Sequence, residues 1–180
     1  MGKAGGNLRA ILRDETRVEH DRLDALMGDL ALGDEADYAV FLRIQYLARA
    51  PLEAWLAEHL PAEYGPPAQS RLLEDDLAAL GRLIAQPPAR FAAPAQGALG
   101  AAWVVAGSSL GNRAILAQRR KKGLDGPHSF LSCSRLPHYF KHLLGIMDSA
   151  DDPQCAVAGA KAVFAWFEAT ARQELGEVAQ

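Results

Sequence analysis

The stretch Gly97–Lys122, GALGAAWVVAGSSLGNRAILAQRRKK, has the composition of a helix but contains glycine at positions 97, 100, 107 and 111. Each glycine inside a helix costs roughly 1 kcal/mol relative to alanine, so these four cost about 4 kcal/mol unless the fold needs them. Either of two needs would explain them: a second backbone packing very closely, or a flat ligand lying against bare main chain. Gly107 and Gly111 lie one turn apart on one face of the predicted helix. The small-x-x-x-small spacing is also typical of helix–helix contacts, so both interpretations remain open.

The rest of the sequence is rich in alanine and leucine, and its β-branched residues are scattered, which favours helix over sheet. Helical periodicity predicts an all-α chain of six or seven helices in two layers. The predicted helices run from Asn7 to about Met27, from Asp34 or Asp37 to about Leu60 with a kink at Pro51, over Gln69–Ala85, over Gly97–Lys122, in short pieces over His128–Met147 with Pro137 in a first turn, and from Asp151 or Asp152 to about Leu175.

Length and charge limit the classes of function. A chain of 180 residues fits a single domain, residues 1–180, with a substantial core. A net charge of −3 argues neither for nucleic acid nor for an acidic membrane surface as the partner. Cys133 and Cys155 form no CxxC pair, which favours a reducing compartment. No apolar run approaches the roughly 18–20 residues of a membrane span, so we expect a cytoplasmic protein without a membrane anchor.

His20 is the histidine whose surroundings point most clearly to a ligand. It shares a helical stripe with Leu12, Thr16, Leu23 and Met27, and Arg13 lies two turns earlier on the same side. An imidazole in an apolar stripe with a guanidinium nearby suits a flat ligand that carries a central metal and carboxylates at its edge. A buried histidine bonded to a carbonyl is the alternative, and the spacing alone favours this alternative.

Two other polar groups are less informative. His138 and His142 have the i, i+4 spacing of a metal pair, but no third ligand lies at a motif spacing. The run Arg119–Lys122 ends a predicted helix, where cations are favoured by the helix dipole.

Taken together, two segments resemble the heme oxygenase family, and the closer likeness is to its bacterial branch, which often accompanies phytochrome photoreceptors. These segments are LRDETRVEH (Leu12–His20) and WVVAGSSLGNR (Trp103–Arg113), and the likeness extends over nearly the whole chain. It implies a single-domain, all-α bundle in which heme lies between a proximal and a distal helix.

The resemblance also implies a set of site residues. His20 would be the proximal ligand of the heme iron, and Gly107 with Gly111 the distal glycines. The other heme-binding positions would be Arg13 and Lys141 at the propionates, Thr16 one turn before His20, Trp103 four places before Gly107, and Phe164 packed on the heme. Ser108 stands where the animal enzymes carry aspartate, and Asn112 replaces a second glycine. We expect Ser108, Ser109 and Asn112 to hold ordered water as weak donors.

The function implied by the resemblance is the O2-dependent opening of heme to biliverdin, with release of CO and ferrous iron. Heme would be both cofactor and substrate. No flavin or nicotinamide motif is present, so electrons would come from an external donor such as ferredoxin, flavodoxin or a reductase. The alternatives are a non-catalytic heme- or bilin-binding sensor or carrier, and a helical interaction module in which the glycines serve packing only.

Overall fold

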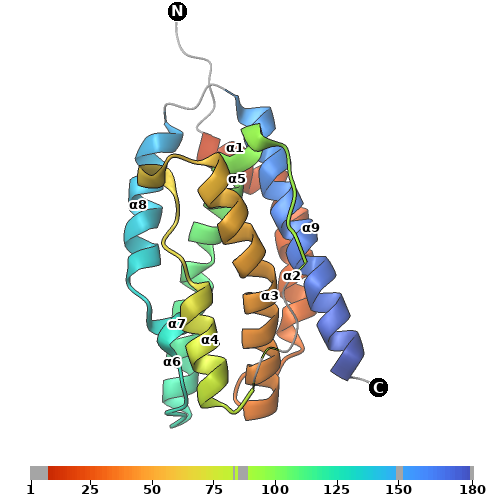
Figure 1. Cartoon of the computed structure of the whole chain (residues 1–180). Coiled ribbons are helices and arrows are strands. Elements are labelled where there is room, and N and C mark those ends of the chain that lie inside the picture. The colour runs from red at the N-terminus through yellow and green to blue at the C-terminus, as the bar shows by residue number, and fades with distance from the viewer. Residues whose placement is uncertain (1–7, 83, 85–88, 149–151, 179–180) are drawn as a thin grey trace, which may run out of the picture.

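The computed structural model describes residues 8–82, 84, 89–148 and 152–178 (Figure 1). These residues form helices without any strand, which confirms the all-α prediction. The α-helices are α1 (Leu8–Glu15), α2 (Arg17–Gly28), α3 (Glu35–His59), α4 (Ser70–Ala79), α5 (Ala98–Gly107), α6 (Ser109–Lys121), α7 (Ser129–Ser132), α8 (Arg135–Met147) and α9 (Pro153–Val178), with 3-10 turns η1 (Ala62–Tyr64) and η2 (Ala95–Gly97). The described residues thus contain more helices than the six or seven predicted.

Two of the extra helices arise from single-residue breaks at hydroxyl side chains. Thr16 separates α1 from α2 and donates from Oγ1 to the Leu12 carbonyl at 2.7 Å. Ser108 separates α5 from α6 and donates from Oγ to the Val105 carbonyl at 2.6 Å. Such bonds from a side chain to the preceding turn bend helices. The single helices predicted over Asn7–Met27 and Gly97–Lys122 are therefore each wrong by one break, and the cap at Asn7 lies outside the described residues.

The predicted helix Gln69–Ala85 is also too long, because α4 ends at Ala79. Gly81 has φ +67° and donates from its N–H to the Ala78 carbonyl at 3.0 Å, while Arg82 N–H donates to Leu77 at 2.9 Å. This pair of bonds is the Schellman ending of a helix, which glycine favours because it adopts positive φ without strain. Ala85, the predicted end of this helix, lies outside the described residues.

The other predicted helix ends are close to those observed. Asp34 caps α3 by accepting from the N–H groups of Ala36 and Asp37 at 2.8 and 3.1 Å. Asp152 accepts from Cys155 N–H at 3.1 Å at the start of α9, and this bond lowers the pKa of its carboxyl. Pro51 lies inside α3, and Pro137 lies in the first turn of α8, as predicted.

α9 is the helix on which much of the bundle packs. It runs along one side of the molecule, and α1, α2, α3 and α5 all contact it (Figure 1). The α5–α9 crossing is very close, because a Cβ at Gly100 would overlap the Ala156 backbone and one at Gly97 would overlap Gly159. Two of the four glycines in the quoted stretch are therefore explained by helix packing.

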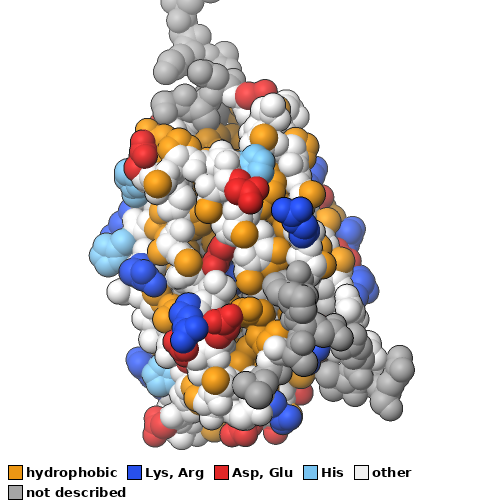
Figure 2. All heavy atoms as spheres, in the orientation of Figure 1, with side chains coloured by type: hydrophobic (Ala, Val, Ile, Leu, Met, Phe, Trp, Pro, Cys, Tyr) orange, Lys and Arg blue, Asp and Glu red, His pale blue; other side chains and the backbone are white. Residues whose placement is uncertain are grey.

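The core has two parts. One lies among α1, α3, α5, α8 and α9, and the other lies among α3, α4, α6 and α7. Charged side chains of both signs are interspersed on the face shown in Figure 2, which offers no extended surface of one sign. No helix in the described ranges is both long and apolar enough to cross a membrane.

Candidate functional site

The first half of the candidate site is α2, a helix with no buried residue. His20 lies on it with 57% of its side chain exposed, so the alternative of a buried histidine is wrong. Its ring meets the edge of Phe164 from α9, with centroids 6.0 Å apart and an interplanar angle of 69°. The structure thus brings together two of the residues predicted from the sequence, at the surface where α2 packs on α9.

The charges around His20 orient its imidazole. Nδ1 lies 3.4 Å from the Asp24 carboxylate one turn later and 3.7 Å from that of Asp21. A carboxylate beside one ring nitrogen favours the N–H tautomer there and leaves the lone pair on the other nitrogen. Nε2 of His20 is therefore the nitrogen available to bind a ligand.

The other predicted residues on α1 and α2 have different roles in the structure. Thr16 is 1% exposed and its hydroxyl is bonded to Leu12, so it shapes the α1–α2 break. Arg13 is exposed and lies 3.2 Å from the Asp14 carboxylate. Lys161 of α9 pairs with Glu15 and Glu19 at 3.6 and 3.9 Å, which ties α9 to both helices.

The second half of the candidate site is an uncovered strip along α5 and α6, here called the glycine face. A Cβ added at Gly107 or Gly111 would meet no described atom within 4 Å. Leu110 between them is 63% exposed and is one of three exposed large apolar side chains among the described residues. The glycine face consists of Gly107, Leu110, Gly111 and Ala114, and the half-buried Trp103 borders it one turn before Gly107 on the same helical stripe.

This observation separates the four glycines into two pairs. Gly97 and Gly100 serve the contact with α9, whereas no described residue packs on Gly107 or Gly111. Trp103 is a second indication that this site lacks a binding partner, because its Nε1 is buried and has no hydrogen-bond partner among the described residues. A buried indole N–H normally finds a partner.

The polar residues predicted to hold water lie beside the glycine face, and that role stays a prediction. Ser109 and Asn112 are only 4% and 7% exposed, on the side of α6 that faces the core. Ser108 uses its hydroxyl twice, donating to Val105 and accepting from Arg49 Nη2 at 2.6 Å. The glycine face itself therefore carries no ionisable side chain.

Sequence reasoning missed Arg49, the largest fully buried side chain of the described chain. Its guanidinium donates from Nε to Gln45 Oε1 at 2.9 Å and lies over the rings of Phe130 and Phe167, at 5.0 and 5.9 Å. Burial lowers the pKa of Arg49 to about 10, and the nearby Glu53 carboxylate partly opposes this shift. Gln45 and Arg49 occupy apolar positions of the α3 stripe, which is the signal that could have revealed them.

The predicted histidine pair and Lys141 have less support as site residues. His138 Nδ1 lies 2.7 Å from the Ser134 carbonyl, and the described chain contains no group of three His, Cys, Asp or Glu side chains placed to hold a metal ion. Lys141 is exposed on α8, and its predicted role stays a prediction.

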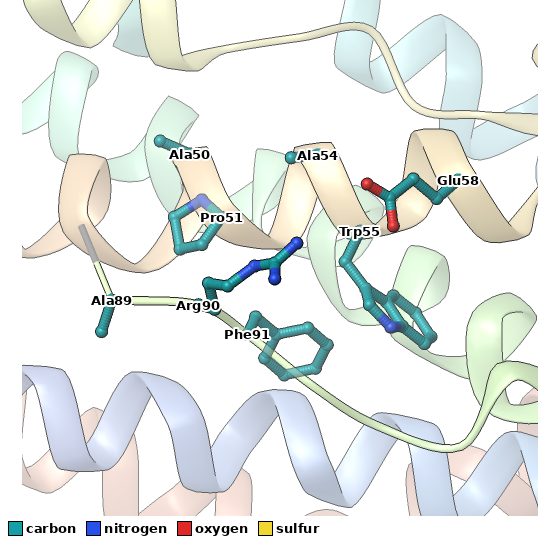
Figure 3. Close-up of a pocket in the computed structure, with 8 residues that line it drawn as sticks. All are labelled: Ala50, Pro51, Ala54, Trp55, Glu58, Ala89, Arg90 and Phe91. Carbon is teal, nitrogen blue, oxygen red and sulfur yellow. The ribbon is translucent and has the colours of Figure 1, made fainter. Parts of the chain in front are cut away.

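A pocket of about 250 Å³ lies between α3 and the segment Ala89–Phe91, with Trp55 and Glu58 on its wall. Figure 3 shows the Arg90 side chain reaching from this segment towards α3. The pocket contains none of the predicted site residues and is smaller than the roughly 300 Å³ at which ligand pockets begin.

Comparison with known proteins agrees with this architecture. The chain superposes on the crystal structure of a heme oxygenase from Neisseria meningitidis, solved with NO and CO bound, with a TM-score of 0.75 and 20% sequence identity. The match covers 96% of this chain and 94% of that one. No protein-family model and no curated protein matches the sequence. The structural likeness shows that the chain has the heme oxygenase fold.

Proposed function

We propose that this protein, as a single domain over residues 1–180, binds heme between α2 and the glycine face and opens it oxidatively to biliverdin, with release of CO and iron. The observation that carries the proposal is the open space at Gly107 and Gly111, on an apolar helix face that nothing in the described chain covers. The heme oxygenase fold supports it, as does the bacterial neighbour that binds NO and CO. Placement in the bacterial, phytochrome-associated branch belongs to the same proposal.

The residues that border the candidate site fit a heme. His20 Nε2 is the candidate iron ligand, oriented by Asp24 and packed on Phe164. A single imidazole suffices when a macrocycle provides the other ligands of the metal. Arg13 and Lys141 are exposed cations that suit the propionates. Trp103, with its unpartnered Nε1, borders the same face as the two glycines.

Heme, when bound, supplies the iron at which O2 reacts and the ring that is oxidised. The residues of the chain orient the heme and exclude water from it. Gly107 and Gly111 present bare main chain, and Leu110 presents an apolar side chain to keep water away. Because the Ser108 hydroxyl proton is committed to the Val105 carbonyl, the glycine face offers no side-chain proton donor. Electrons come from an external donor such as ferredoxin, flavodoxin or a reductase.

The test is to incubate the heme complex with ascorbate or reduced ferredoxin under O2 and to record absorption spectra. Loss of the Soret band together with a new red bilin band is the expected result. A complex that stays spectrally unchanged would instead make the protein a heme-binding sensor or carrier. Failure to take up heme would contradict both and leave a helical interaction module.

A further inference from the structure

Arg49 carries a positive charge that the folded chain keeps almost completely away from water. The side chain is 1% exposed, and the nearby Glu53 carboxylate, which raises its pKa, forms no salt bridge with it. With a pKa of about 10, the guanidinium is protonated at neutral pH. A buried charge without a close counter-ion is unfavourable, and apolar side chains of similar size often replace such groups without loss of stability. Packing alone therefore does not explain why an arginine occupies position 49.

The partners of Arg49 connect it to the glycine face. Nη2 donates to the Ser108 hydroxyl at 2.6 Å, and Ser108 directly follows Gly107 at the break between α5 and α6. Gln45 holds Nε from the other side at 2.9 Å, and the rings of Phe130 and Phe167 flank the guanidinium. Nη1 is buried and has no hydrogen-bond partner among the described residues. The guanidinium is thus fixed beside the site, and its Nη1 nitrogen remains as a donor without a partner.

We propose that Arg49 determines ligand specificity at the proposed heme site, as a buried cation behind the glycine face that favours anionic over neutral ligands of the iron. This inference rests on the proposed function. In a site of low dielectric, a fixed positive charge stabilises an anion more strongly than it would in water, and it acts little on a neutral diatomic.

The probes are azide, titrated into the ferric heme complex, and CO, titrated into the ferrous complex. Arg49→Met removes the charge at similar volume and is expected to lower azide affinity by about tenfold or more, with CO affinity within about threefold of the wild type. Arg49→Lys keeps the charge and should recover most of the azide affinity. The ligand-free Arg49→Met protein should melt at the wild-type temperature or above it.

Arg119→Met is the matched control. Arg119 is also buried, at 6% exposure, but its guanidinium lies over Tyr38 and donates to the Leu32 carbonyl, away from the glycine face. Its loss should leave azide affinity within about threefold of the wild type. If Arg49→Met yields no folded protein, Arg49→Gln makes the same test.

Unchanged azide affinity in a heme-loaded Arg49→Met or Arg49→Gln protein would overturn the role of Arg49 while leaving the proposed function intact. An equal loss for azide and CO, or an equal loss in Arg119→Met, would overturn it as well, because either result means general damage. A wild-type protein that takes up no heme would overturn the proposed function and, with it, this inference.

Discussion

Gly111 lies in the first turn of α6 with its α-carbon exposed, and open space lies where a methyl group would go. Alanine is the better helix former, so Gly111→Ala should leave the stability of the ligand-free protein unchanged or raise it by up to about 1 kcal/mol. The same methyl group would stand between the glycine face and heme. We therefore expect less biliverdin, with heme affinity changed by less than about tenfold, or roughly 1.4 kcal/mol.

Gly145→Ala provides the control for this change. Gly145 lies inside α8, and a Cβ there also meets no described atom within 4 Å. It should give the same gain in helix stability without any effect on biliverdin yield. Melting temperatures and product yields of both variants show whether Gly111 faces the ligand. A strongly destabilised Gly111→Ala protein would contradict that role.

Individual residues differed in how well the sequence revealed them. The family resemblance names His20 and Phe164 as two separate heme contacts, and the structure places their rings next to each other. Arg49 was missed because its position in the apolar stripe of α3 was the one signal of it in the sequence, and its burial depends on Ser108, Phe130 and Phe167 from other elements meeting around it. Ser109 and Asn112 were expected to hold ordered water, whereas one residue of helical rotation, about 100°, places Asn112 away from the face of Gly111.

At the scale of helices, the crossing of α5 and α9 is the contact that tolerates least change. A Cβ at Gly100 would overlap the backbone of Ala156, which cannot move aside as a flexible side chain can. Gly100→Ala should therefore destabilise the protein by about 1–3 kcal/mol or more, despite the better helix propensity of alanine. Urea unfolding measures this loss, and a Gly100→Ala protein as stable as the wild type would contradict the close crossing.

Helix ends and breaks were harder to predict than helices. Hydrophobic periodicity runs through Thr16 and Ser108 without interruption, because each break is one residue long and the backbone bond Asn112 N–H to Ser108 O continues across it. The sequence did contain a stop signal at Gly81, which the predicted helix overran. The positive φ of this glycine ends α4 in a Schellman motif. The difference between Gly97 and Gly107 could not be read from the sequence, since only the position of α9 distinguishes a packed glycine from an uncovered one.

At the scale of the whole molecule, the exposed helix α2 and the helix α5 that leads into the glycine face pack on the same partner. Both α2 and α5 pack on α9, and no extended contact joins α2 to α5 or α6 in the described part of the chain. The all-α class followed from composition and periodicity alone. The specific architecture followed from the family resemblance, and the superposition on a heme oxygenase supports that architecture as a fold.

The central claim is that His20 binds the iron of a heme, and titration of hemin into the ligand-free protein tests it most directly. His20→Ala should melt within about 2 °C of the wild type, because the side chain is 57% exposed. Wild type and the control His138→Ala should take up heme with the same Soret band. We predict that His20→Ala binds heme at least about tenfold more weakly, or roughly 1.4 kcal/mol, with a shifted Soret band. An unchanged affinity and spectrum in His20→Ala would contradict the claim.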